Sequence, residues 1–177
     1  ASLKRIYDPQ KKIITIEDPV EYELEGINQI PVNPKRGLDF AAGLRHILRQ
    51  DPDKILVGEI RDLETAQIAV EASLTGHVVF STLHTNDAPS SIIRLIDLGI
   101  EAFLLTATVE AVVAQRLVRR VCNECKVEYE PTDDMLMELE LTPSEVQART
   151  FFYDRGCKEC NGSGYEDRIE LFEIMVM

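Results

Sequence analysis

The 177-residue sequence lacks any apolar run close to the ~20 residues that a membrane-spanning helix needs, so no such helix is predicted. Its first four residues do not resemble the start of a signal peptide, and we therefore expect a soluble, cytoplasmic protein. Basic residues are also few relative to acidic ones: the sequence has 19 lysines and arginines and 31 acids, which gives a net charge of −12. That charge opposes nonspecific binding to DNA or RNA, and no nucleic-acid partner is expected.

Cysteine is sparse as well, with four residues that form two C-x-x-C pairs separated by 31 residues. The pairs are Cys122 with Cys125 and Cys157 with Cys160. Disulfides are not expected in the cytoplasm, whereas two such pairs can supply the four thiolates of a tetrahedral metal site. Thiolate ligands at this spacing favour a structural zinc ion, Zn²⁺. The alternative is four ordinary buried cysteines without a metal.

Three apolar runs are separated by helical patterns, and each run ends in acids or a histidine. The predicted strands cover residues 12–17, 54–59 and 77–83. Continuous apolar runs of this length are typical of buried parallel strands. In an open α/β sheet the ligand site lies beyond the carboxyl ends of the strands, so Glu21, Glu59 and His84 should meet in one crevice.

The segments around these strands complete an α/β fold, in which a parallel sheet is flanked by helices. The helices are predicted from apolar periodicity and from capping residues at their ends, and they cover residues 39–50, 63–75, 88–98 and about 101–120. The composition changes at Cys122 to cysteines, acids and a glycine-rich turn. We therefore expect a core domain over residues 1–121 and a small Cys₄ metal-binding subdomain over residues 122–177.

Two acidic segments carry the candidate catalytic groups. Residues 51–59 have the form of a Walker B strand, in which Glu59 would hold Mg²⁺ or its water against a nucleotide phosphate. Residues 17–21 place three carboxylates around Pro19, and Glu21 is favoured as the general base that aligns a water for attack on phosphorus. The alternative for both segments is a solvated acid at a strand end, which is common in proteins.

Two histidines and two arginines are further candidates. His77 and His84 bracket the third predicted strand, and the polar neighbours of His84 suit a phosphate sensor or a subunit contact. Arg45 and Arg49 share one helix face at i, i+4 and could neutralise phosphate charge in a neighbouring subunit. The alternatives are hydrogen-bonded structural histidines and a solvated basic face that pairs with nearby acids.

Taken together, these segments closely resemble the secretion ATPase superfamily, in particular the type II secretion ATPase and its type IV pilus assembly counterpart. Residues 16–21 look like its Asp box, residues 48–62 like its arginine segment with Walker B, and residues 75–86 like its His box. Residues 115–117, followed by the two cysteine pairs, look like the metal-binding insertion that the related retraction ATPases lack.

The resemblance implies a RecA-like sheet and a hexameric ring that hydrolyses ATP with Mg²⁺. The ring would drive type II secretion, or pilus or pseudopilus assembly, through platform proteins of the inner membrane. The resemblance implies that Glu21 activates the attacking water and that Glu59 binds Mg²⁺. It also implies that His77 and His84 sense the γ-phosphate or the next subunit, and that Arg45 and Arg49 neutralise charge.

The family's phosphate-binding loop, G-x-x-x-x-G-K-[ST], does not occur in the 177 residues, and residues 1–7 resemble the tail of the helix that follows this loop. We therefore expect a carboxy-terminal fragment of a motor that neither binds nor hydrolyses ATP alone. Two alternatives stay open. One is a zinc-dependent protein-docking module with a vestigial α/β part. The other is a related DNA-transport or conjugation ATPase, which the net charge and the cysteine pairs disfavour.

Overall fold

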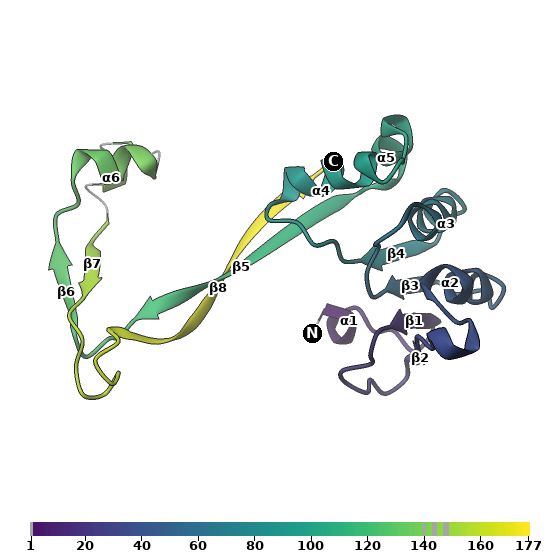
Figure 1. Cartoon of the computed structure of the whole chain (residues 1–177), viewed down its shortest axis with the longest axis horizontal. Helices are drawn as coiled ribbons and strands as arrows, with labels where there is room; N and C mark the ends of the chain where they lie inside the picture. Colours follow the sequence, from purple (N-terminus) through teal and green to yellow (C-terminus); the bar gives the residue numbers. More distant parts are fainter. Residues whose placement is uncertain (1, 140, 143–144, 147–148) are drawn as a thin grey trace. The chain divides into compact units, whose positions relative to one another are not determined.

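The computed structural model describes residues 2–139, 141–142, 145–146 and 149–177, and the chain divides into two compact units (Figure 1). Unit 1 comprises the chain up to Ala114 together with Glu173–Met177, and unit 2 comprises Gln115–Phe172. Val121, the boundary expected from composition, is the last residue of strand β5 (Ala111–Val121).

Unit 1 contains a four-stranded parallel sheet with the strand order β2-β1-β3-β4. The strands are β1 (Ile13–Glu17), β2 (Asn28–Pro31), β3 (Lys54–Val57) and β4 (Val78–Ser81). The register places Ile14 between Asn28 and Ile55, and Ile55 beside Val79. Because all four strands run in one direction, their carboxyl ends meet at one edge of the sheet.

Helices α2 (Phe40–Leu48) and α3 (Leu63–Leu74) lie side by side against the same face of this sheet (Figure 1). Both begin where the sequence predicts, because Asp39 accepts a hydrogen bond from the Ala42 N–H and Asp62 accepts one from the Thr65 N–H. The buried core between helices and sheet consists mainly of Ile14, Ile16, Leu44, Ile47, Ile55, Val57 and Ile68. The predicted α/β class, with a parallel sheet flanked by helices, is confirmed.

Four further helices are described in unit 1. They are α1 (Ser2–Arg5), the 3-10 helix η1 (Pro34–Arg36), α4 (Ala88–Asp97) and α5 (Ala102–Thr108). A second buried cluster joins Ile100 and Leu105 to Ala66 of α3. The side chain of Asp87 accepts a hydrogen bond from the Ser90 N–H at the start of α4. Within the described residues, none of the helices combines the length and the apolar character needed to cross a membrane.

Strand β4 is less buried than its apolar sequence predicts. Val78 is 48% exposed and Phe80 is 36% exposed, whereas Val79 packs against the core. The strand is at one end of the strand order, so within the described residues it has a hydrogen-bonded neighbour on one side only. The expectation of a fully buried strand was wrong here, because an apolar run does not indicate whether its strand is central or at an edge.

The long helix predicted over residues 101–120 is also wrong. Helix α5 ends at Thr108, and the chain continues as β5, which pairs with β8 (Tyr165–Val176) in a two-stranded sheet. The segment from 109 to 121 contains five valines. Valine is stiff at χ1 and packs well on a pleated surface, and pairing with the distant β8 overrides the helix propensity of the neighbouring alanines and leucines.

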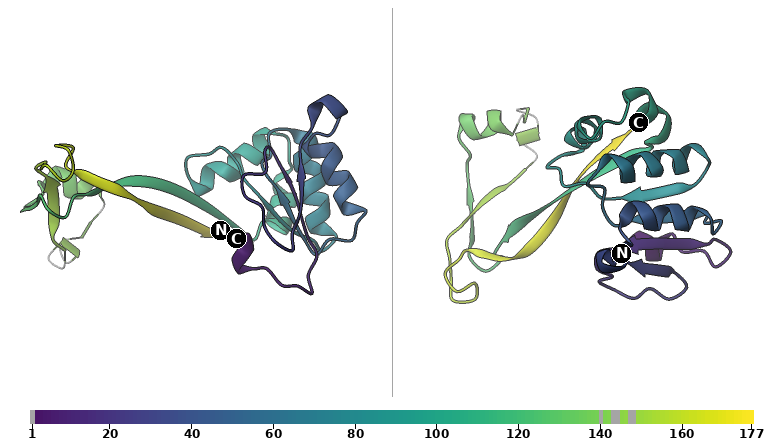
Figure 2. Two further views of the ribbon diagram at one scale, coloured as in Figure 1. Left: turned by 90° about the horizontal axis from the view of Figure 1, so that it is seen from below. Right: turned by 45° about the vertical axis from the view of Figure 1, so that its right-hand side comes forward.

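Unit 2 contains a second, antiparallel two-stranded sheet formed by β6 (Lys126–Tyr129) and β7 (Phe151–Asp154). The ring of Tyr129 meets the rings of Phe151 and Tyr153 edge to face, at centroid distances of 6.5 and 5.9 Å. Helix α6 (Asp133–Glu138) begins after Thr132, whose hydroxyl accepts a hydrogen bond from the Met135 N–H. In the right-hand view of Figure 2 the yellow β8 runs beside the teal β5.

Gly43, on the buried face of α2, offers a test of core packing, because an added methyl group would overlap Ile16 of β1. We expect Gly43→Ala to destabilise the protein by about 1–2 kcal/mol in chemical denaturation. Overpacking a buried site costs roughly 1–3 kcal/mol, which exceeds the ~1 kcal/mol or less that alanine gains over glycine in a helix. Ile16→Val removes the overlapping Cδ1, so the double variant should be more stable than the two single effects predict. Strict additivity would contradict the contact.

Candidate active site and metal centre

The loops that follow β1, β3 and β4 line one crevice of about 790 Å³ in unit 1. Glu21 comes from the loop after β1, Glu59 lies two residues after the end of β3, and His84 comes from the loop after β4. The structure therefore brings together the three side chains that the parallel-strand argument places at one edge. Other residues that line the crevice include Lys4, Glu17, Asp18, Gln29, Arg61 and Thr82.

The backbone at Glu59 is held on both sides. The Gly58 N–H donates to the Ile16 carbonyl oxygen at 2.8 Å, and the Ile60 N–H donates to the Thr82 carbonyl oxygen at 3.1 Å. The Thr82 hydroxyl donates to the Gly58 carbonyl oxygen at 2.7 Å. A Cβ on Gly58 would lie only 3.1 Å from the Ile16 carbonyl oxygen, so this close approach favours glycine. Hydrogen bonds between neighbouring segments thus continue beyond the ends of the strands and fix the backbone at Glu59.

The Glu59 carboxylate is nearly buried, since its side chain is 11% exposed. Its Oε2 lies 2.5 Å from Arg61 Nε and 3.0 Å from His84 Nε2. The hydrogen bond from Arg61 is the main cause of a lowered pKa for Glu59, and His84 lowers the pKa further, whereas burial acts in the opposite direction. Within the described residues, Oε1 has no hydrogen-bond partner. The site therefore holds an ionised carboxylate with one oxygen available to a ligand.

The loop after β1 presents a second carboxylate to the crevice. Its Asp18–Pro19 peptide bond is cis, and two residues later the exposed Glu21 lines the crevice. In the described part of the chain, no group donates a hydrogen bond to the Glu21 carboxylate. An exposed carboxylate without a partner can accept a proton from a bound water, which is what a general base requires.

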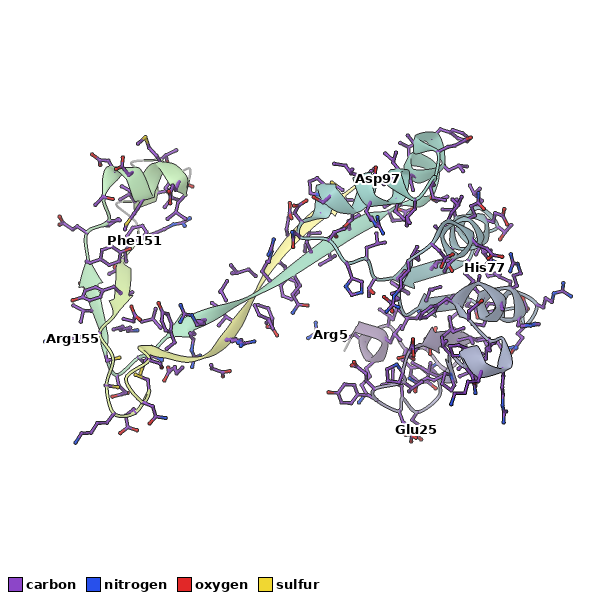
Figure 3. All side chains as sticks on the ribbon, in the orientation of Figure 1. Arg5, Glu25, His77, Asp97, Phe151 and Arg155 are labelled. Carbon is purple, nitrogen blue, oxygen red and sulfur yellow. The ribbon has the colours of Figure 1, made fainter. Side chains whose placement is uncertain are left out.

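His77, which was predicted as a site residue together with His84, lies elsewhere in unit 1. It precedes β4, so it is at the edge of the sheet opposite to the crevice, beside the carboxyl end of α3 (Figure 3). Its Nδ1 is 3.0 Å from the Ala72 carbonyl oxygen and 3.1 Å from the Thr75 hydroxyl. The strand between the two histidines separates them, so they do not share one site within a single copy of the chain.

Arg45 and Arg49 also lie outside the crevice. Both side chains are exposed on α2, and Arg45 forms an ion pair with Glu64 of α3 at 2.5 Å. Arg49 is the C-cap residue of α2. The two arginines are four residues apart and both exposed, but neither lines the crevice at Glu59.

Arg61 is a residue of the site that the sequence argument did not single out. It follows Glu59 by two positions in non-helical backbone, a spacing that places side chains on the same side of an extended chain. The pKa of Arg61 is raised by Glu59 and, to a smaller extent, by Asp18. An acid followed two residues later by a base, directly after a buried strand, was the signal that could have identified it.

The four cysteines of unit 2 form one cluster, in which all Sγ atoms lie within 4.8 Å of one another. The Sγ–Sγ distances are 4.0 Å for Cys122 and Cys157, 3.9 Å for Cys125 and Cys160, and 3.6 Å for Cys157 and Cys160. A tetrahedral ion with metal–sulfur bonds of ≈ 2.3 Å separates its ligands by about 3.8 Å. The arrangement can therefore hold one metal ion, as the paired spacing predicts.

The surroundings of the cluster support a bound cation. The N–H groups of Cys157 and Gly164 each donate to Cys160 Sγ at 3.2 Å, and these bonds lower the pKa of Cys160 to about 6. Burial, together with the neighbouring thiols, raises the pKa of Cys125 to about 12. Four thiolates so close together repel one another, so full ionisation of the cluster requires a positive ion among them.

The whole chain, residues 1–177, matches the family described as "Type II/IV secretion system protein", and the chain belongs to this family. It is 54% identical over 175 residues to the Type IV pilus assembly ATPase PilB of Thermus thermophilus, covering 99% of this chain and 20% of that protein. It is 51% identical over 177 residues to the Type II secretion system protein E of Dickeya dadantii, covering 100% of this chain and 35% of that protein. The chain thus spans only a minor part of these relatives.

Solved structures agree with this assignment. The pilus retraction motor PilT, in a crystal structure with bound ADP, matches with a TM-score of 0.59 and 41% identity over 64% of this chain and 36% of that chain. The ATPase DotB of Legionella pneumophila matches with a TM-score of 0.53 and 34% identity over 78% of this chain and 42% of that chain. The family resemblance inferred from the acidic, histidine and cysteine motifs is confirmed.

Replacing Arg61 by glutamine should raise the pKa of Glu59, because the group that lowers this pKa most is removed. An NMR titration of the Glu59 carboxyl carbon measures the shift. Arg45→Gln is the matched control, since Arg45 pairs with Glu64 and its loss should leave the pKa of Glu59 unchanged.

The same change predicts a pH-dependent stability difference. A carboxylate whose pKa is lowered on folding stabilises the protein above its ordinary pKa, and that contribution is lost as the pH falls through the lowered value. The difference in unfolding free energy between the natural protein and Arg61→Gln should therefore shrink across that acidic range. An unshifted Glu59 pKa in the variant would contradict the assigned electrostatics.

Proposed function

We propose that this chain is part of an ATPase that powers type II secretion or type IV pilus assembly. In this proposal the crevice at Glu59 receives the terminal phosphate of ATP. The observation that carries the proposal is the meeting of Glu21, Glu59 and His84 around one crevice, with Glu59 kept ionised by Arg61 and His84. The names of the relatives point to the same activity, which we propose for the whole protein.

The residues of the crevice divide the chemistry among them. Carboxylate oxygens are ligands that Mg²⁺ prefers, and the free Oε1 of Glu59 would accept a hydrogen bond from a water of the ion. Bound Mg²⁺ neutralises charge on the phosphates. Glu21 would take the proton of the water that attacks phosphorus. His84, which contacts Glu59, would respond to the presence of the phosphate.

The predicted residues outside the crevice suit a different role. Arg45 and Arg49 are exposed, and His77 is at the opposite edge of the sheet, so we propose that these residues act on a neighbouring copy in a ring, hexameric in the parent protein. A ring of this kind would work in the cytoplasm at the inner membrane, through platform proteins of the secretion or pilus machinery. The ordered contacts of Glu59 support a working site over a vestigial one, which disfavours the alternative of a zinc-dependent docking module.

We further propose that the ion of the cysteine cluster is a structural zinc. Four thiolates at tetrahedral spacing close the coordination shell, whereas catalytic zinc keeps an open position for water or substrate. The soft sulfur ligands favour zinc over the harder ions Mg²⁺ and Ca²⁺.

The full-length protein should hydrolyse ATP, and Glu21→Gln should lower kcat by roughly 10²–10⁴-fold, because the amide cannot accept the proton of the attacking water. The KM for ATP should change little. A steady-state phosphate-release assay measures both parameters, and Gln67→Glu on the exposed face of α3 is a control that should keep full activity. Normal turnover by Glu21→Gln would refute the assigned general base.

The 177-residue polypeptide provides the matching negative control. It contains no G-x-x-x-x-G-K-[ST] segment to supply backbone N–H groups to the phosphates, so calorimetric titration with ATP and Mg²⁺ should show no binding. Micromolar affinity of this polypeptide for ATP would contradict the proposal that the phosphate-binding loop is required.

Elemental analysis of the purified protein should find one zinc ion per chain. Chelation, or Cys160→Ser, should abolish hydrogen-exchange protection in β6 and β7, because zinc contributes ~10–16 kcal/mol of apparent folding free energy in small zinc domains. The parallel sheet of unit 1 should keep its protection. Ser163→Ala, which changes a neighbouring residue that is not a ligand, should retain the metal. A protein that contains no metal and keeps β6 and β7 protected would refute the structural zinc.

A further inference from the structure

The side chain of Gln29, on β2, makes three hydrogen bonds, to the last residue of β1 and to the loop that follows it. Its Nε2 donates to Glu17 Oε1 and to the Tyr22 carbonyl oxygen, each at 3.0 Å. Its Oε1 accepts the Leu24 N–H at 2.7 Å. The orientation of the amide follows from its partners, because the N–H of Leu24 can only donate while a carbonyl and a carboxylate only accept.

These bonds join the two ends of the acidic loop. Glu17 is the last residue of β1, and its Oε1 also accepts the Thr15 hydroxyl at 2.5 Å. Thr15 is the register partner of Gln29 in the parallel sheet. Tyr22 lies on the far limb of the loop, one residue after Glu21. One half-buried amide on a regular strand therefore closes the short segment that contains Glu21.

The same contacts separate the roles of two neighbouring acids. Oε1 of Glu17 accepts hydrogen bonds from Thr15 and from Gln29, so this carboxylate anchors the loop. The Glu21 carboxylate lines the crevice and, within the described residues, receives no hydrogen bond, so it is the acid that stays available to a water.

We propose that Gln29 is a positioning residue for the general base, which holds the backbone of Glu21 at the crevice without touching the reacting atoms. This inference rests on the proposed function, in which Glu21 activates the water. Positioning matters because a displacement of about 1 Å in a catalytic group can cost roughly 100-fold in rate.

The test is Gln29→Glu in the full-length protein. The new carboxylate keeps the length of the side chain but cannot donate to Tyr22, and it repels Glu17. We expect kcat to fall roughly 10- to 100-fold because the loop carries the base, and the KM for ATP to rise as well, because the added carboxylate lines the crevice that receives the phosphates. The ratio of variant to natural kcat should rise as the pH falls, since the introduced carboxyl group regains one O–H donor when it is protonated.

Two further variants and one local measurement complete the design. Gln67→Glu makes the same change of charge on the exposed face of α3 and should keep the natural kcat. Gln29→Met keeps the length without adding charge and should also lower kcat, with little change in the KM for ATP and no such pH dependence of the ratio. Hydrogen exchange should accelerate over residues 18–24 in both Gln29 variants and stay unchanged in α3.

The outcomes are distinguishable. An active natural protein in which both Gln29 variants match Gln67→Glu refutes the role of Gln29 and leaves the proposed function in place. Accelerated exchange in α3 as well as in the loop would make Gln29 a general folding residue and would also overturn the proposal. A natural protein without ATPase activity refutes the proposed function, and the positioning role with it.

Discussion

A carboxylate that is almost removed from water remains ionised only when other groups replace its hydration. Glu59 meets this constraint through Arg61 and His84, which both reach the same oxygen. The arrangement depends on the parallel sheet, since β3 supplies Glu59 and the loop after β4 supplies His84. It also depends on the close approach of Gly58 to Ile16, where an added Cβ would lie only 3.1 Å from the Ile16 carbonyl oxygen. The ionised state of Glu59 thus depends on the backbone positions of β1, β3 and β4.

Much of this unit could be predicted because its signals are local. Asp39, Asp62 and Asp87 cap their helices with side-chain hydrogen bonds, so the starts of α2, α3 and α4 follow from the sequence. The apolar runs in β1 and β3 correspond to buried strands. The predicted helix over residues 101–120 failed because β5 gains its pairing from β8, and a partner so distant in sequence leaves no local pattern. The exposure of β4 has a similar origin, since position in a sheet is a property of the whole topology.

The site shows the same division. Glu21, Glu59 and His84 could be placed together because parallel strands deliver their carboxyl ends to one edge. Gln29 could not be identified in this way, since its role depends on the path of a loop and on individual hydrogen bonds, whereas the spacing of Glu59 and Arg61 was a local signal that could have been used. For Arg45, Arg49 and His77 the spacing reveals a shared face or a strand end, but it does not reveal which edge of the sheet that face adjoins. The cysteine cluster was predictable because the spacing of two C-x-x-C pairs is itself the signature of a four-thiolate metal site.

The chain leaves unit 1 after Ala114 and returns at Glu173, whose carboxylate accepts the Ala88 N–H at 2.9 Å. Every residue that lines the crevice precedes position 85. The chain leaves unit 1 on β5 and returns on β8, and these two strands pair with each other, so unit 2 is inserted between two paired strands. Residues could therefore be inserted into unit 2, or removed from it, without interrupting the segment of the chain that forms the crevice.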